Sequence, residues 1–321
     1  MIDIRIIIGI GIVVLFLLYF VSRKPCIVSS NNNTYDLHVY PWGTQVVIKD
    51  ILTTGWTGDV DGTDFKWERK PQNYSGFYQL DTGSHLLTDL LMMKRKEVLK
   101  VLDKHGIKHE NLIESGYAYL QGGTPPINIY QDIRVDNKKI NHVPVGLMAL
   151  NDQGNMLKER EIVNGVAGLS HIKGGSLKPY SFLDKLLENV SRKTLFIDFK
   201  NEKMITGLDS SPDNNHFKGK IDSDGDTMRM DVWVTDNRGN SYPMLVDTGT
   251  LYSQFKYTGE VKLNGISDKK SSGTLIMKNA KMLPPRLVGN GKPVILGYND
   301  LYKGSMFIDY DNYMLYINQN Y

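Results

Sequence analysis

A four-residue motif that occurs twice constrains the fold of this chain more than any other feature. Asp81-Thr82-Gly83-Ser84 follows the largely apolar run 77–80, and Asp247-Thr248-Gly249-Thr250 follows the apolar run 243–246. The two aspartates lie 166 positions apart in a chain of 321 residues. Two such motifs are expected by chance in roughly one chain of this length in 10⁵. A second pattern, two apolar residues and a glycine, follows each motif at residues 166–168 and 295–297. The repeat predicts two related lobes, one for each half of the chain.

Short strand-like segments make up most of the remaining pattern. They are apolar or alternating runs, separated by Gly, Asn and Asp, at residues 44–51, 77–80, 127–135, 195–199, 228–234, 244–246 and 306–317. Helical periodicity occurs at residues 86–105 and at residues 180–190. The sequence therefore predicts an all-β protein with few short helices.

Each motif brings the same chemical groups to a sharp turn. Its glycine lacks a Cβ, so backbone N–H groups can approach a carboxylate. Its threonine can hydrogen-bond to the other turn, and its last residue can donate a hydroxyl to an outer carboxylate oxygen. If the turns face each other, Asp81 and Asp247 come within hydrogen-bonding distance, and like charges that close cannot both ionise. A water held between them then meets a base and an acid, which is the equipment for adding water to an amide carbonyl.

The chain resembles the pepsin-like, bilobal aspartic proteases over most of residues 44–318. Besides the two motifs, the segments that carry the resemblance are 164–170 in the first half and 293–297 and 306–310 in the second. The resemblance implies an all-β fold of two pseudo-twofold-related lobes. It also implies an aspartic endopeptidase in which Asp81 and Asp247 activate a water and the other motif residues support the geometry of the pair. No metal or organic cofactor is implied.

The resemblance further implies a flap on the hairpin 117–133. Tyr119 matches the family's flap tyrosine best, Tyr117 is the second choice, and Gly122 and Gly123 lie near the tip. Thr88 stands where the family has a tryptophan that hydrogen-bonds to the flap tyrosine, and threonine cannot do that. The alternative to an active protease is a catalytically inactive protease-fold protein that binds peptides or has a structural role at a membrane.

Residues 6–22 are a run of 17 uncharged, mostly apolar residues, which is at the short end of what spans a membrane. Three interpretations are open: an uncleaved membrane anchor, a cleaved signal peptide and a buried core helix. We favour the anchor, because no small-residue cleavage site follows and the run is apolar on every face. The expected organisation is an anchor at 1–26, a polar linker at 27–43, an N-terminal lobe at 44–200 and a C-terminal lobe at 201–321.

Charge and cysteine content narrow the expected partners. The formal net charge is +3 and no block of five like charges occurs, so nucleic acid is not an expected partner. Cys26 is the only cysteine, which excludes an intrachain disulfide and favours a reducing compartment. Arg23 and Lys24 outnumber Arg5, which slightly favours a cytosolic body behind a single-pass anchor, whereas three Asn-X-Ser/Thr triplets would fit a lumenal one. We expect a monomer that acts on a peptide or protein substrate.

Overall fold

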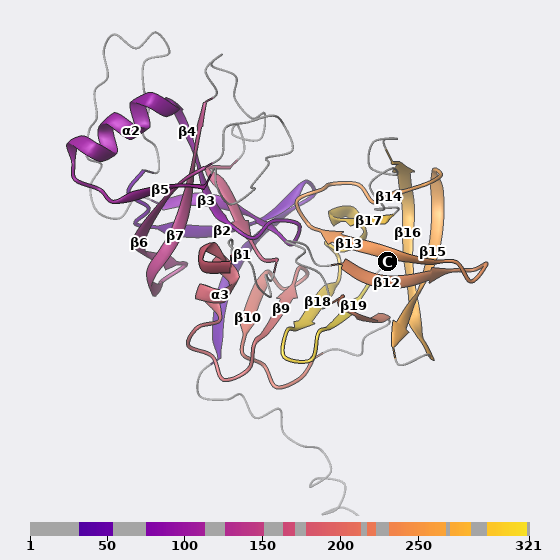
Figure 1. Cartoon of the computed structure of the whole chain (residues 1–321). Helices are drawn as coiled ribbons and strands as arrows, with labels where there is room; N and C mark the ends of the chain where they lie inside the picture. The colour runs from indigo at the N-terminus through magenta and orange to yellow at the C-terminus, as the bar shows by residue number, and fades with distance from the viewer. Residues whose placement is uncertain are drawn as a thin grey trace, which may run out of the picture.

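The computed structural model describes residues 32–53, 75–112, 126–150, 163–170, 178–212, 217–222, 231–267, 270–283 and 294–319. Within these ranges the chain forms nineteen strands and two short α-helices, α2 (Arg95–Lys104) and α3 (Phe182–Leu186). Two 3₁₀ turns, η3 (Lys178–Tyr180) and η4 (Tyr298–Asp300), complete the helical elements that are described. The prediction of an all-β chain with few short helices is confirmed. Figure 1 shows one group of strands, indigo to magenta, on the left and another, orange, on the right, with β9 (Thr194–Asp198), β10 (Lys203–Thr206), β18 (Ser305–Asp309) and β19 (Met314–Asn318) between them.

The first group of strands belongs to the N-terminal half. Its members are β2 (Gly43–Lys49), β3 (Ser75–Asp81), β4 (Leu87–Lys94), β5 (His109–Asn111), β6 (Ile127–Val135), β7 (Lys138–Leu150) and β8 (Gly165–Gly168). Most neighbours are antiparallel, but β3 pairs with β8 and β4 pairs with β7 in parallel. Helix α2 buries Val98, Val101 and Leu102 against the core of this sheet.

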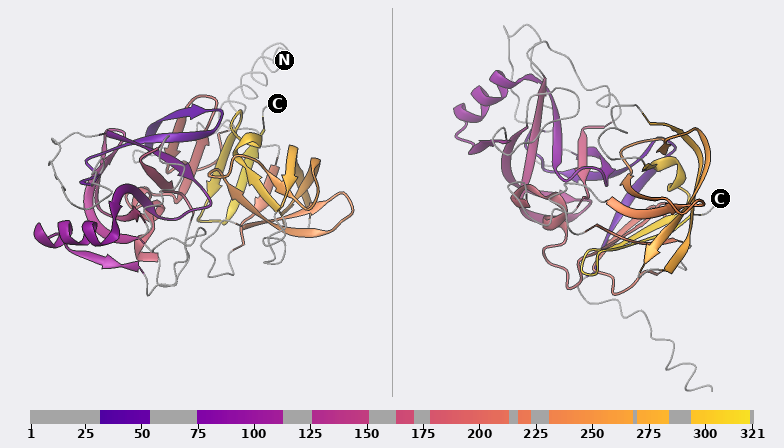
Figure 2. Two further views of the ribbon diagram at one scale, coloured as in Figure 1. Left: turned by 90° about the horizontal axis from the view of Figure 1, so that it is seen from above. Right: turned by 45° about the vertical axis from the view of Figure 1, so that its right-hand side comes forward.

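The second group belongs to the C-terminal half. Its members are β12 (Asp231–Asp236), β13 (Ser241–Asp247), β14 (Gln254–Phe255), β15 (Gly259–Ser267), β16 (Lys270–Met282) and β17 (Val294–Gly297). Strand β13 pairs antiparallel with β12 and parallel with β17. Seen from above in Figure 2, this group lies beside the first.

A third, fully antiparallel sheet joins the two groups. Its order is β1 (Asn33–Tyr40), β10 (Lys203–Thr206), β9 (Thr194–Asp198), β18 (Ser305–Asp309), β19 (Met314–Asn318) and β11 (Phe217–Lys220). At its edges β1 also pairs with β2 and β11 also pairs with β16. Every residue of β18 is buried, so this sheet is covered on both faces at its centre. It therefore forms the common base on which both lobes stand.

Matched strand pairs give the sequence repeat its structural form. In the first half Asp81 is aligned with Gly168 across the parallel pair β3–β8. In the second half Asp247 is aligned with Gly297 across the parallel pair β13–β17. Each aspartate therefore ends a strand whose neighbour ends in the glycine of the second repeated pattern.

The prediction of a helix over residues 86–105 is wrong for its first half. Residues 87–94 form strand β4, because their nearly continuous apolar run is buried between β7 and β8. The helix begins only after Lys94, whose N–H donates to the side chain of Glu97. The second predicted helix, 180–190, is shortened to α3, with the Ser181 hydroxyl accepting the Asp184 N–H at its start.

Part of the N-terminal prediction falls within the described residues. Residues 33–40, which belong to the expected linker, form strand β1 and pair with both β2 and β10. The apolar run 6–22 lies outside the described residues. No helix within the described ranges is long and apolar enough to cross a membrane.

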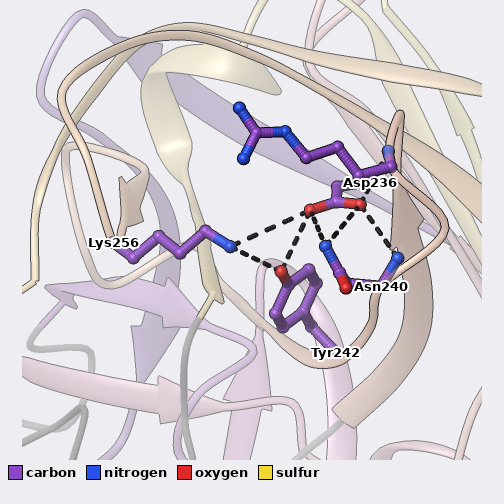
Figure 3. Close-up of polar contacts among 5 residues, drawn as sticks. Asp236, Asn240, Tyr242 and Lys256 are labelled. Atoms are coloured by element: carbon purple, nitrogen blue, oxygen red, sulfur yellow. Dashed lines mark hydrogen bonds and ion pairs between the residues drawn. The ribbon is translucent and has the colours of Figure 1, made fainter.

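A buried aspartate fixes the turn between β12 and β13. The carboxylate of Asp236 accepts hydrogen bonds from the backbone N–H of Arg238 and from the backbone and side chain of Asn240. The hydroxyl of Tyr242 also donates to it at 3.0 Å, and the Lys256 ammonium lies 3.9 Å away. Figure 3 shows these side chains converging on the carboxylate. Because these groups favour the charged form, they hold the pKa of Asp236 well below its usual value.

Candidate active site

The two motif aspartates lie at the ends of equivalent strands. Asp81 is the last residue of β3 and Asp247 is the last residue of β13. The buried side chains of Leu80 and Val246 precede them and belong to the main hydrophobic core. Packing of these two side chains in the core therefore anchors the chain immediately before each turn.

Reciprocal hydrogen bonds join the two turns. The backbone N–H of Thr82 donates to Oγ1 of Thr248, and the N–H of Thr248 donates to Oγ1 of Thr82, both at 3.1 Å. Each threonine hydroxyl then donates to a backbone carbonyl of the other half: that of Thr82 to Val246 at 2.8 Å, and that of Thr248 to Leu80 at 2.9 Å. Both threonine side chains are buried. Four buried hydrogen bonds thus hold the backbones that carry the aspartates against each other.

The two glycines allow each carboxyl to lie against the opposite turn. The N–H of Gly83 donates to Oδ1 of Asp81 at 2.7 Å, and the N–H of Gly249 donates to Oδ1 of Asp247 at 2.9 Å. A Cβ on Gly83 would lie 2.7 Å from Cγ of Asp247, and a Cβ on Gly249 would lie 2.6 Å from Cγ of Asp81. No side chain fits at either position without moving a carboxyl group.

Proximity of the carboxyls changes their protonation. Burial raises the pKa of Asp81 well above its usual value, and the charge and hydrogen bond of Asp247 raise it further. Hydrogen bonds from the N–H groups of Gly83 and Gly249 act in the opposite direction but are smaller effects. The pair therefore keeps a proton at pH values where an ordinary aspartate has lost it.

The two halves of the site differ in their hydroxyl support. Oγ1 of Thr250 donates to Oδ2 of Asp247 at 2.8 Å, and the N–H of Thr250 donates to Oδ1 at 3.1 Å. The N–H of Ser84 bonds to the backbone carbonyl of Asp81, and within the described residues its hydroxyl makes no hydrogen bond to that carboxyl. The Thr250 hydroxyl therefore gives the carboxyl of Asp247 a donor whose counterpart the carboxyl of Asp81 lacks in the described part of the chain.

The flap residues of the sequence analysis lie outside the described residues. These are Tyr117, Tyr119, Gly122 and Gly123. Thr88, at the position of the family's tryptophan, is buried and its hydroxyl accepts the N–H of Val166 at 3.3 Å. That side chain is therefore engaged within the sheet.

The glycine of the second repeated pattern allows close packing behind each turn. A Cβ on Gly168 would lie 2.6 Å from the backbone of His85, and a Cβ on Gly297 would lie 2.5 Å from the backbone of Tyr252. The residue after Gly168, Leu169, donates its N–H to the carbonyl of Asp81. In the sequence these glycines are recognisable only as the last residue of the second repeated pattern. Their role follows from their alignment with the aspartates across the parallel strand pairs in the structure.

Within the described ranges, no group of three or more His, Cys, Asp or Glu side chains is placed to hold a metal ion.

Comparison with known proteins places the fold. No family model matches the chain, and no curated protein matches its sequence. Among solved structures, the aspartic proteinase from Irpex lacteus has a similar fold, with a TM-score of 0.55 and 10% sequence identity. The match covers 90% of this chain and 97% of that one. At this identity the similarity bears on the fold alone: the chain has the bilobal fold of pepsin-like aspartic proteinases, as the sequence resemblance implies.

Proposed function

We propose that this protein is an aspartic endopeptidase that hydrolyses peptide bonds with a water activated between Asp81 and Asp247. The observation that carries the proposal is the hydrogen-bonded carboxyl pair, held by reciprocal bonds between two equivalent turns. A pair that shares one proton supplies a base and an acid at the same point, as addition of water to an amide requires.

The unequal support of the carboxyls suggests how the roles divide. Asp247, whose charge is stabilised by Thr250, accepts a proton from the attacking water. Asp81, which retains the shared proton, donates it to the carbonyl oxygen of the peptide bond as the water oxygen attacks the carbon. The tetrahedral species then collapses: Asp247 passes its proton to the amide nitrogen, Asp81 takes a proton from one of the two hydroxyls on the carbon, and the carbon–nitrogen bond breaks. The pair again holds one proton, on Asp81. No covalent bond to the protein forms at any step.

The expected substrate is a peptide or a protein, and the expected location is a membrane. Residues 6–22 support a single-pass anchor by their length and lack of charge. The flanking charges slightly favour a body on the cytosolic side. Tyr119, with Tyr117 as second choice, remains our proposal for the flap residue that closes over substrate, with Gly122 and Gly123 permitting its movement.

Cleavage of a random peptide library by the full chain in detergent tests the proposal. Asp81→Asn and Asp247→Asn should each abolish cleavage, and the double variant should be no worse than either single one, because the carboxyls act on one water. The pH–rate profile should be bell-shaped. Asp103→Asn, at an aspartate whose side chain is 72% exposed, is the matched control and should retain activity.

Binding of a peptide that carries a statine-like hydroxyl separates an enzyme from a peptide-binding protein. Such a peptide mimics the tetrahedral species, so an enzyme should bind it far more tightly than a matched substrate. Equal binding of the two peptides, together with absence of cleavage, would favour the catalytically inactive alternative.

A further inference from the structure

Two buried tyrosines connect the C-terminal half of the chain to the backbone behind the candidate active site. Tyr298 begins η4, directly after strand β17, and Tyr310 directly follows strand β18. Both side chains are buried, and both hydroxyl groups bond to residues of the N-terminal half. They therefore cross between the two lobes.

Tyr298 is hydrogen-bonded on both sides of the junction. Its backbone N–H donates to the carbonyl of Thr250 at 2.8 Å, the residue whose hydroxyl supports Asp247. Its hydroxyl donates to the carbonyl of Tyr40 at 2.8 Å and accepts the hydroxyl of Thr44 at 3.0 Å. Thr44 lies in β2, the neighbour of the strand that ends in Asp81. One residue thus ties the second catalytic turn to the sheet of the first.

Tyr310 reaches the first turn through a single residue. Its hydroxyl donates to the carbonyl of Leu169 at 2.9 Å, and the N–H of Leu169 donates to the carbonyl of Asp81 at 2.8 Å. The peptide groups of Leu169 are therefore held between the tyrosine and the aspartate backbone. The N–H of Tyr310 donates to the backbone carbonyl of Lys193 at 2.9 Å, which ties the residue to the start of strand β9 in the joining sheet.

We propose that Tyr298 and Tyr310 are positioning residues that set the separation of the carboxyls of Asp81 and Asp247 across the lobe junction. The proposal rests on the proposed function for its link to catalysis, but the separation of the carboxyls can be measured without any activity. Neither tyrosine touches the reacting groups. Each acts through the backbone that carries one of the two turns.

The neighbours of the tyrosines make a hydroxyl deletion a clean test. The ring of Tyr298 packs edge-on against Phe199, with the ring centroids 5.8 Å apart, and phenylalanine preserves that contact. Burial raises the pKa of Tyr298 to about 12 and that of Tyr310 further, so neither hydroxyl ionises in the working range. His85, beside the first turn, has its pKa lowered to about 4 by burial and is uncharged above that value. Neither tyrosine hydroxyl nor His85 therefore changes its charge near neutral pH.

The experiment compares Tyr298→Phe and Tyr310→Phe with the full wild-type chain. The carboxyl groups of the two aspartates are titrated by carbon-13 NMR and assigned with Asp81→Asn and Asp247→Asn. Interaction between two carboxyls drives their apparent pKa values apart, so a wider separation brings the values together. We expect each tyrosine variant to narrow the gap by at least about 0.5 pH units and to lower kcat about tenfold, with KM changed less than about threefold.

Two further variants separate positioning from general stabilisation. Tyr35→Phe removes a hydroxyl from another buried tyrosine, on β1, which makes no bond to either catalytic turn within the described residues. It should leave the pKa gap unchanged. Thr44→Val removes one partner of Tyr298, so it should reproduce part of the effect, and the effects of Thr44→Val and Tyr298→Phe should not add.

Each outcome decides between a positioning role and a purely structural role for the two tyrosines. A lowered melting temperature with an unchanged pKa gap in both tyrosine variants overturns the positioning role and leaves only a structural one. A narrowed gap supports it even if no peptide is ever cleaved, in which case the proposed function fails and the positioning inference stands. An equal narrowing of the pKa gap in Tyr35→Phe would also overturn the positioning role.

Discussion

The glycine of the second turn provides a direct test of how closely the two carboxyls are held. Gly249→Ala adds one methyl group, whose carbon would lie 2.6 Å from Cγ of Asp81. Ordinary contact begins at 3.4 Å, so the methyl and the carboxyl must separate by a further 0.8 Å. Gly249 is not among the described glycines with a left-handed backbone, so alanine itself fits the turn. The closest contacts of the added methyl group are therefore all with the carboxyl group of Asp81.

The size of the effect follows from this displacement. A misplacement of about 1 Å at reacting groups costs about 100-fold in rate, or about 2.7 kcal/mol of barrier. Overpacking at a filled site also lowers the free energy of unfolding by about 1–3 kcal/mol. We therefore expect Gly249→Ala to lower kcat/KM at least about 100-fold while the protein still folds.

The assay is peptide cleavage under steady-state conditions, with thermal unfolding measured in parallel. Gly43→Ala is the matched control, because its Cβ would meet the end of the flexible Gln79 side chain at 3.3 Å and that side chain can move aside. It should retain activity within about threefold. A Gly249→Ala protein that kept more than about a tenth of wild-type kcat/KM would refute the reasoning, since the carboxyl would then be free to move without loss.

Three other predictions follow from the hydrogen bonding and protonation of aspartates. Thr250→Ala should lower kcat/KM about tenfold and Ser84→Ala less than about threefold, because only the Thr250 hydroxyl donates to its carboxylate; equal losses would contradict this asymmetry. Asp81→Asn should raise the melting temperature near pH 7 but not below about pH 3.8. Because the pKa of Asp81 is raised, the folded wild type holds a proton that the unfolded chain has released, so the stability of the wild type falls as pH rises from 3.8 towards the raised value. Parallel curves of melting temperature against pH for the wild type and Asp81→Asn would contradict this prediction. Asp236→Asn should lower the melting temperature near pH 7, because the lowered pKa of Asp236 stabilises the wild type only while the carboxylate is charged. The difference in melting temperature between wild type and variant should shrink as pH falls below 3.8. A difference that does not depend on pH would exclude the carboxylate charge as its cause.

Much of the candidate site could be predicted from the residues alone. The groups that a carboxyl pair needs lie within four consecutive residues of each turn, and the two copies are 166 positions apart in the sequence. The roles inferred for Thr82 and Thr248 agree with the reciprocal bonds in which the structure places them. Local chemistry of this kind requires a turn, a strand before it and a second copy, and all three leave a pattern in the sequence.

Other local patterns were ambiguous because the sequence does not say what covers a segment. The run 87–94 has the apolar content of a buried helix and of a strand buried on both faces. It forms a strand because it pairs in parallel with β7 and antiparallel with β8. Both partners come from residues more than fifty positions further along the chain, so no window of sequence could include them.

Residue types at short spacing were enough to predict the duplication of the chain, its mainly β character and its two candidate aspartates. The difference between the two motifs is visible only in the folded chain, where the Thr250 hydroxyl donates to Asp247 whereas Ser84, its counterpart in the first motif, makes no such bond to Asp81. The structure alone also brought Tyr298 to Thr44, 254 positions away in the sequence. Contacts of that range depend on how whole sheets pack, and packing is a property of the folded chain.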